Sequence, residues 1–199
     1  MKALVTGGSG LIGSAICEAL ASEGLHVLVH ANQNLDRARQ VVEKIRSAGQ
    51  SAETACFDVS DRKATSHHLE NILESGPVQV LVNNAGIYDD ATMAGMLPEQ
   101  WDSVIQITLN GFFNVTHPLL LPMIRSRWGR IISISSITGV AGNRGQTNYA
   151  AAKSGLHGAS KSLSKEVASR GITVNVVAPG IIQSSSTDEH FSDTDVKNI

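Results

Sequence analysis

Tyr149 and Lys153 are the residues of this sequence whose types and spacing most directly suggest chemistry, and three alanines separate them. In a helix, side chains four residues apart lie on one face, about one turn from each other. Alanine favours the helix and leaves that face open to a flat ligand. A phenol titrates near about pH 10, and a neighbouring ammonium lowers that pKa. We therefore expect Lys153 to lower the pKa of Tyr149, although a non-catalytic tyrosine beside a solvated lysine would show the same spacing.

A glycine-rich turn near the start of the chain could hold a phosphate. Gly7, Gly10 and Gly13 lie three residues apart between an expected strand and an expected helix. Glycine permits a tight turn and close approach of the backbone to a pyrophosphate, and the helix N-terminus favours an anion. The turn predicts a dinucleotide site formed by Gly7, Ser9, Gly10, Ile12 and Gly13.

The elements that would position these residues alternate along the chain. Short apolar runs predict strands at 2–6, 26–29, 51–57, 78–82, 130–135 and 172–177, and the intervening patterns predict helices at about 11–23, 34–48, 60–75, 98–126 and 148–169. Near-continuous apolar strands alternating with helices indicate a parallel sheet that is covered on both faces. The sequence predicts an α/β fold: a Rossmann-type, doubly wound parallel sheet in a single domain.

Length and composition restrict the remaining possibilities. We expect residues 1–182 to form one nucleotide-binding domain that carries the catalytic site, and residues 183–199 to form a flexible, polar substrate-loop segment, with a final strand of the sheet missing. A net charge of −2 argues against nucleic acid as the main partner. Cys17 and Cys56 stand in apolar contexts, and no His, Cys or Asp cluster has metal spacing. Without a signal peptide or a membrane-spanning run, we expect a cytoplasmic protein.

The ends of the second, third and fourth expected strands bear on nucleotide binding. The second strand ends at Asn32 without a carboxylate, and Arg37 and Arg39 follow, which favours NADP while leaving NAD open. The third ends at Asp58-Val59, where the aspartate could read the adenine edge or cap the next helix. Asn83-Asn84-Ala85-Gly86 follows the fourth strand, where open α/β sheets bind ligands.

Together these motifs resemble the short-chain dehydrogenase/reductase family. The matching elements, in order, are TGGSGLIG, DV, NNAG, a serine in SSITG, YAAAK and PGII, which together cover residues 2 to about 184. Within the family, the segment from Gly129 to Gly180 is most similar to the β-ketoacyl-[acyl-carrier-protein] reductases.

The resemblance implies a role for each matching residue. Tyr149 would be the acid that protonates a carbonyl oxygen as hydride arrives, Lys153 would bind the nicotinamide ribose, and Ser136 would hydrogen-bond the substrate oxygen. Ser135, its neighbour on a strand, should face the other way. Asn83, Ala85 and Gly86 would line the cofactor ribose, while Pro179, Gly180 and Ile182 would face the nicotinamide.

Two positions depart from the family pattern. The second glycine of the turn comes one residue early, at Gly10, which weakens the preference for NADP. Thr108 aligns with the asparagine that holds a relay water in the family. Asn110 lies two residues further, about 200° around a helix, and would need a backbone bulge to reach the same place. A threonine hydroxyl could hold the water, or activity could be reduced.

The resemblance implies an NADP(H)-dependent reductase of a 3-oxoacyl thioester, with acyl carrier protein as a candidate partner and a homodimer or homotetramer as the assembly. Arg125, Arg127, Arg130, Lys165 and Arg170 could form a basic rim for the carrier, or simply be solvated helix ends. A dehydrogenase of a small alcohol or sugar, and a catalytically weak nucleotide-binding homologue, are the alternatives.

Overall fold

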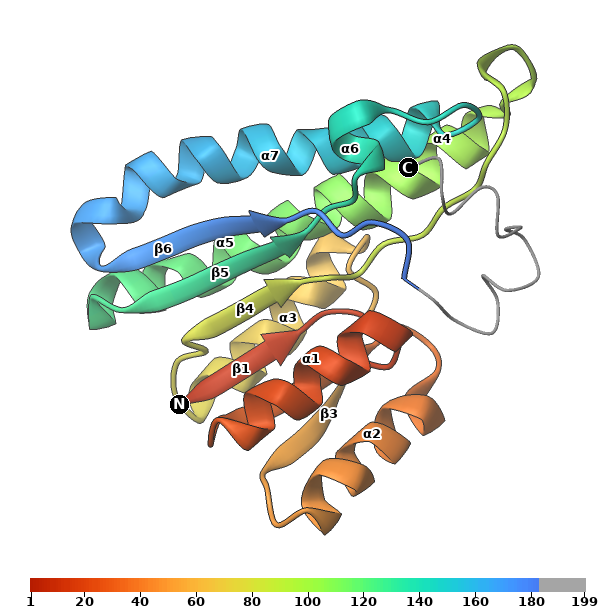
Figure 1. Ribbon diagram of the computed structural model, residues 1–199. Coiled ribbons are helices and arrows are strands. Elements are labelled where there is room, and N and C mark those ends of the chain that lie inside the picture. The colour runs from red at the N-terminus through yellow and green to blue at the C-terminus, as the bar shows by residue number, and fades with distance from the viewer. Residues whose placement is uncertain (183–199) are drawn as a thin grey trace.

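A single parallel sheet forms the centre of the protein in the computed structural model, which describes residues 1–182 (Figure 1). Its six strands lie in the order β3-β2-β1-β4-β5-β6, and every neighbouring pair is parallel. The strands are β1 (Lys2–Val5), β2 (His26–Ala31), β3 (Ala52–Cys56), β4 (Val80–Asn83), β5 (Gly129–Ile134) and β6 (Ile172–Val177). The predicted Rossmann-type α/β fold is confirmed.

Helices cover both faces of the sheet. The longer ones are α1 (Leu11–Ser22), α2 (Leu35–Ser47), α3 (Arg62–Glu74), α4 (Pro98–Ile105), α5 (Gly111–Ser126) and α7 (Thr147–Val167), and the short helix α6 spans Thr138–Ala141. Helices α1 and α2 pack on one face, and α3, α5 and α7 pack on the other. Among residues 1–182, no helix is both long and apolar enough to cross a bilayer.

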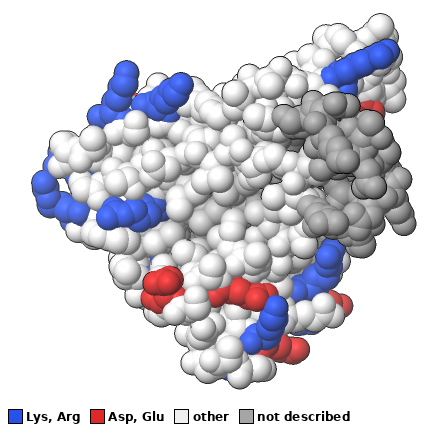
Figure 2. Space-filling model, in the orientation of Figure 1, with Lys and Arg blue, Asp and Glu red and all other residues white. Residues whose placement is uncertain are grey.

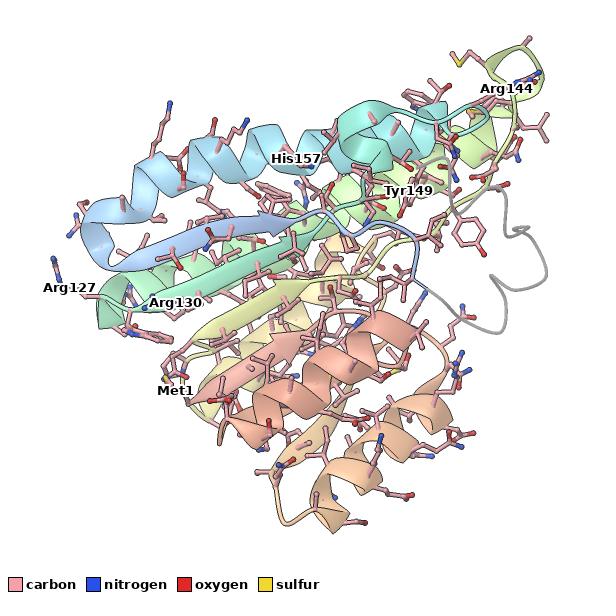
Figure 3. All side chains as sticks on the ribbon, viewed as in Figure 1. Met1, Arg127, Arg130, Arg144, Tyr149 and His157 are labelled. Atoms are coloured by element: carbon pink, nitrogen blue, oxygen red, sulfur yellow. The ribbon has the colours of Figure 1, made fainter. Side chains whose placement is uncertain are left out.

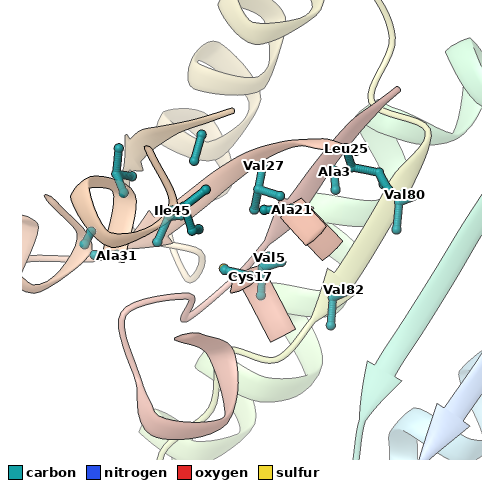
Figure 4. Packing of buried hydrophobic residues seen from close by; sticks show 14 of the residues in the cluster. Ala3, Val5, Cys17, Ala21, Leu25, Val27, Ala31, Ile45, Val80 and Val82 are labelled. Atoms are coloured by element: carbon teal, nitrogen blue, oxygen red, sulfur yellow. The ribbon is translucent and has the colours of Figure 1, made fainter. Parts of the chain in front are cut away.

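Strand alternation creates the two halves of the core. On β1, Ala3 and Val5 point towards α1 and α2 (Figure 4), whereas Leu4 points towards α3 and α5. All three side chains are fully buried. Because both faces are apolar, β1 is fixed at the middle of the sheet. The strand order reverses between β1 and β4, and the crevice for a ligand opens beyond the carboxyl ends of these two strands.

The expected helix at 98–126 is not continuous. A π-helical segment, η2 (Gln106–Asn110), separates α4 from α5. A π-helical turn holds an extra residue, so an apolar pattern read at 3.6 residues per turn runs through it unnoticed. The sequence also gave no sign of α6 or of the 3₁₀ turns η1 (Met93–Gly95) and η3 (Ala168–Arg170). The predicted polar segment 183–199 lies outside the described residues.

Candidate active site

A cleft of about 440 Å³ lies beyond the carboxyl ends of β1 and β4. This is large enough for a small-molecule or cofactor site. The glycine turn forms one wall, the turn after β4 forms the floor, and the start of α7 forms the other wall. The predicted site residues that line it are Gly7, Ser9, Gly10, Ile12, Gly13, Ala85, Gly86, Tyr149, Lys153 and Ile182. The structure therefore brings the phosphate motif and the Tyr-Lys pair together in one cleft.

The glycine turn is shaped for close approach to an anion. Gly7 has a positive φ of 62°, which favours glycine, and its carbonyl accepts a hydrogen bond from the Gly10 amide at 3.0 Å. A Cβ on Gly13 would lie only 2.2 Å from the Gly7 carbonyl oxygen. Helix α1 begins at Leu11, and the amides of Leu11, Ile12 and Gly13 donate to no other group in residues 1–182. These residues fit the pyrophosphate of a dinucleotide.

Three side chains hold the turn in place from inside the protein. The Thr6 hydroxyl donates to the Val82 carbonyl at 3.3 Å and accepts from the amides of Asn84 and Ala85. The Asn84 side-chain amide donates to the carbonyls of Thr6 and Gly7. His30 accepts from the Gly7 amide at 3.0 Å. No motif or spacing in the sequence predicts this role for Thr6, Asn84 or His30.

Asn83, the last residue of β4, and Asn84, which follows it, have different roles, contrary to our expectation that Asn83 lines the cofactor site. Asn83 is buried and its side-chain amide donates to the Thr116 hydroxyl, away from the cleft. Asn84 lines the cleft instead. Strand alternation accounts for this, because Asn83 continues the face of Leu81 that packs towards α5.

The other predicted cofactor residues lie outside the lining of this cleft. Asn32 is exposed just after β2, and its carbonyl lies 3.0 Å from the Cys56 sulfur. Asp58 accepts from the amide and hydroxyl of Ser60, while Asp61 caps α3, so the alternative of Asp58 as the helix cap is wrong. Buried Val59 lines a separate enclosed cavity. Pro179 accepts from the Ile137 amide, and Gly180 is exposed.

Tyr149, labelled in Figure 3, lies near the start of α7. Lys153 lies one turn further along the helix, with its ammonium 5.6 Å from the centre of the phenol ring. The expected lowering of the tyrosine pKa is wrong for this cleft. Burial raises the pKa of Tyr149, and the Asp90 carboxylate adds to the rise, while a hydrogen bond with Ser136 acts in the opposite direction. Tyr149 is therefore protonated at neutral pH.

Burial has the matching effect on the lysine. It lowers the pKa of Lys153 to about 8. The ammonium donates to the Ile134 carbonyl at 2.8 Å, which uses one of its three donors. Lys153 is thus still charged at neutral pH, and it has donors left for a ligand in the cleft.

The loop that carries Ser136 is fastened to α7 by its neighbour. The Ser135 hydroxyl donates to the Lys153 carbonyl at 3.0 Å and lies 2.8 Å from Nε2 of His157. Since its only hydrogen is used on the carbonyl, Nε2 of His157 must be the donor in the second bond. Ser154 donates to the Gly139 carbonyl on the same loop. These hydrogen bonds connect the loop that carries Ser136 to helix α7, which carries Tyr149 and Lys153.

Thr108 lies beside the lysine, within the π-helical segment. Its hydroxyl is buried and has no hydrogen-bond partner among residues 1–182. A methyl group placed on Gly86 would lie 3.2 Å from Lys153 Nζ and 3.3 Å from Thr108 Oγ1, so both polar atoms flank the same glycine. The backbone bulge that could bring Asn110 round is present, yet Asn110 donates to the Gln106 side chain instead. Thr108 occupies this position, and Asn110 does not.

The doubly wound sheet and the cleft define a dinucleotide-binding protein with a Ser-Tyr-Lys cluster beside the nucleotide turn. The family model described as short chain dehydrogenase matches residues 1–195. A 3-oxoacyl-[acyl-carrier-protein] reductase FabG of Aggregatibacter actinomycetemcomitans is 43% identical over 94% of this chain and 78% of that protein. Nodulation protein G of Azospirillum brasilense is 45% identical, and acetoacetyl-CoA reductase of Cupriavidus necator is 42% identical, each over 90% of this chain and 74% of the relative.

The chain belongs to the short-chain dehydrogenase family. It is an oxidoreductase, a short-chain reductase that uses a nicotinamide cofactor.

Proposed function

We propose that the protein reduces a 3-oxoacyl thioester to the 3-hydroxyacyl thioester with NADPH. The observation that carries the proposal is the meeting of Tyr149 and Lys153 with the glycine turn in one cleft, where Ser136 does not line the cleft but hydrogen-bonds Tyr149. Two relatives support the substrate class by their names, one for acyl groups on a carrier protein and one for acetoacetyl-CoA. Both names describe thioesters of a 3-oxo acid.

The residues divide the work of the reaction. The nicotinamide cofactor, when bound, supplies hydride to the carbonyl carbon. Tyr149, kept protonated by burial, donates its proton to the carbonyl oxygen, and the Ser136 hydroxyl hydrogen-bonds the same oxygen. Lys153 holds the ribose with its remaining donors, and its positive charge stabilises the phenolate that Tyr149 becomes. The phenolate then regains a proton from solvent, which completes the addition of two hydrogens.

NADP is favoured over NAD by the groups at the end of β2. Asn32 and Gln33 offer amides where an NAD enzyme would have a carboxylate. The nearest carboxylate, Asp36, accepts from Arg39 at 3.1 Å. Arg37 is exposed on the first turn of α2, where its backbone amide donates to the Asn34 side chain, and its guanidinium, which has no partner among the described residues, would meet a 2′-phosphate. Asp58 and Val59, in the turn that follows β3, remain our candidates for the adenine edge.

A carrier protein and a second copy of the chain are proposed partners. Lys and Arg side chains gather at the edge of the molecule where α7 ends and β5 begins (Figure 2). Arg127 and Arg130 lie there, at the far end of the sheet from Tyr149 (Figure 3), and both donate to carbonyls of the turn before β6. This rim does not border the cleft of its own chain. Phe113 and Leu121 are about half exposed on α5 and support a homodimer or homotetramer. We propose the cytoplasm as the location of the enzyme.

The test is turnover of acetoacetyl-CoA, a soluble 3-oxoacyl thioester, followed by the loss of NADPH absorbance. We expect turnover with NADPH and at least about tenfold weaker binding of NADH, the difference that roughly 1.4 kcal/mol at the 2′-phosphate would produce. Equal affinity for both nucleotides would overturn the NADP assignment. Turnover of simple alcohols but not of the thioester would overturn the substrate class.

One observation favours a second function, that of a nucleotide-binding protein with little turnover. Thr108 replaces the expected asparagine, and its buried hydroxyl is unpaired among residues 1–182. This alternative predicts normal NADPH binding in a titration together with no detectable reduction of 3-oxoacyl thioesters.

A further inference from the structure

His30 is a buried histidine at the end of β2 that the reaction does not use. Only 2% of its surface is exposed. Strand alternation points it to the same face of the sheet as Leu28, towards Phe57, whose ring centre lies 4.3 Å from that of the imidazole. Strand β2 lies between β1 and β3, so the side chain reaches the ends of both neighbouring strands.

Both ring nitrogens of His30 are occupied by backbone groups. Nδ1 lies 3.0 Å from the Gly7 amide, and Nε2 lies 2.8 Å from the Phe57 carbonyl. An amide can only donate and a carbonyl can only accept, so Nδ1 is the acceptor and Nε2 carries the hydrogen. His30 is therefore a neutral imidazole in one tautomer. A protonated ring would have no acceptor for the Gly7 amide.

The two backbone partners belong to different parts of the nucleotide site. Gly7 starts the glycine turn, whose next free amides belong to the start of α1. Phe57 directly precedes Asp58 and Val59, our candidates for the adenine edge. The Gly7 amide is used on His30, so it cannot contact the pyrophosphate, and the phosphate donors must come from α1.

We propose that His30 is a positioning residue for the dinucleotide, which fixes the glycine turn relative to the end of β3 and so presets the span between the pyrophosphate and adenine subsites. Neither subsite is contacted by the ring itself. Its effect is preorganisation: without it, nucleotide binding would have to order the turn.

The ring's electrostatic surroundings agree with this role. Burial lowers the pKa of His30 to about 4, against smaller opposing effects from the Phe57 carbonyl and the Asp58 carboxylate, while His68 adds to the lowering. The neutral tautomer therefore persists at any pH where the enzyme would work. An apolar side chain of similar size could fill the space, but it would leave the Gly7 amide and the Phe57 carbonyl buried without partners.

Calorimetric titration with ADP, NADPH and NADH tests the proposal without any turnover assay. The variants are His30→Leu, which loses both bonds, His30→Asn, which can keep the acceptor for Gly7, and His30→Gln, which can keep the donor to Phe57. Leu28→Ala is the matched control, because it removes buried packing two residues earlier on the same face and touches neither subsite. Thermal unfolding is recorded for each protein.

For His30→Leu we expect Kd for all three ligands to rise about tenfold or more, the equivalent of roughly 1.4 kcal/mol, while Leu28→Ala stays within about twofold despite its lower Tm. His30→Asn should recover most of the loss. If His30→Leu does not fold, the ADP affinities of His30→Asn and His30→Gln decide, because each breaks one bond.

Unchanged ADP affinity in every folded His30 variant, or an equal loss in Leu28→Ala, would overturn the proposal. It rests on nicotinamide-nucleotide binding and not on the thioester substrate. If the variants show the expected differences in ADP affinity but the protein reduces no thioester, the proposed function is refuted and the role of His30 is not.

Discussion

The nucleotide-binding part and the catalytic part of this cleft use their buried polar groups in opposite ways. Around the glycine turn, the side chains of Thr6, His30 and Asn84 have their hydrogen-bonding groups paired with backbone. Near Lys153, the buried Thr108 hydroxyl has no partner among residues 1–182, and Ser133 on β5 and Ser160 on α7 are the other buried side chains without one there. Lys153, also buried, uses a single donor.

This difference follows from what each part must do. A pyrophosphate is bound by backbone amides at fixed places, so the turn is best made rigid before the ligand arrives. Proton transfer instead requires groups that retain unused donors and acceptors. Leaving such groups buried costs stability, of the order of 1–3 kcal/mol each. The catalytic part is destabilised in this way, whereas the paired groups of the nucleotide-binding part are not.

Loss of the tyrosine hydroxyl should have the largest effect. Tyr149→Phe removes the proton donor and leaves the fold unchanged, so we expect turnover to fall by about 10²–10⁴-fold, the range typical of acid catalysis. NADPH affinity, measured by titration, should stay nearly constant because the nucleotide part is formed independently. A variant that retains most of its activity would show that Tyr149 is not the acid.

The pH profile should be limited by the lysine and not by the tyrosine. The lowered pKa of Lys153, about 8, means that its charge is present below pH 8 and is lost above it, whereas the pKa of Tyr149 is raised. We expect kcat/KM of the free enzyme to fall up to about tenfold per pH unit above this value. Lys153→Arg keeps the positive charge at high pH, so the decrease in kcat/KM above this pH should disappear, whatever residual activity the variant has. An unchanged decrease in this variant would contradict the assignment.

Acid should lower the stability of the folded protein through protonation of His30, which holds the nucleotide-binding part in place. Its pKa falls from 6.5 to about 4 on folding, so the unfolded chain binds a proton between these values while the folded one does not. Stability is therefore lost as pH falls from 6.5 to 4, by roughly 3 kcal/mol, since each pH unit is worth about 1.4 kcal/mol per proton. Denaturant unfolding across this range should show a shallower loss in His30→Gln. Parallel curves for the two proteins would exclude His30 as the source.

The energetic contribution of the hydrogen bond between Ser135 and His157 can be tested by a double-mutant cycle. His157→Leu leaves the serine without its donor, and Ser135→Ala leaves both His157 and the Lys153 carbonyl unpaired, so each should lower the free energy of unfolding by about 1–3 kcal/mol. The double variant should lose less than the sum, because the shared bond is lost only once. His157→Gln keeps a donor and is the matched control. Strict additivity would mean that the contact is not energetically coupled.

Substitution of Thr108 should have the smallest effect on turnover. It tests whether the unpaired hydroxyl of this residue takes part in the reaction. Thr108→Val keeps the shape and removes the hydroxyl, so stability should hold or rise slightly because an unpaired buried group is lost. If the hydroxyl serves turnover, kcat should fall several-fold, up to about tenfold for roughly 1.4 kcal/mol. Thr108→Asn, compared in the same assay, reports whether the threonine is a deficit. An unchanged kcat in both would remove Thr108 from the reaction.

The strands could be predicted because the information is local. Strands β2, β4, β5 and β6 each hold several β-branched residues, and the predicted and observed bounds differ little, as for 130–135 against Gly129–Ile134. The glycine turn and the Tyr-Lys pair are also local motifs. Helical periodicity could not show the π-helical turn at Gln106–Asn110, because the apolar pattern continues on both sides of it.

Residues that act through distant partners were missed. His30 meets Gly7 and Phe57 only because β2 lies between β1 and β3, which no spacing in the sequence reveals. Strand alternation could have separated Asn83 from Asn84, had it been applied through the last residue of β4. Likewise, the raised pKa of Tyr149 depends on burial, and spacing to Lys153 alone predicted the opposite sign.

The hydrogen bonds of Thr6 have a consequence for the order in which this chain folds. Its hydroxyl joins the glycine turn to Val82, Asn84 and Ala85, residues separated from it by most of the first half of the chain. Contacts of such long sequence separation form slowly, because the intervening chain must be ordered first. The glycine turn is therefore completed only after β4 has inserted beside β1. During synthesis, a nascent chain that ends before β4 lacks the finished turn, and nucleotide binding cannot stabilise it.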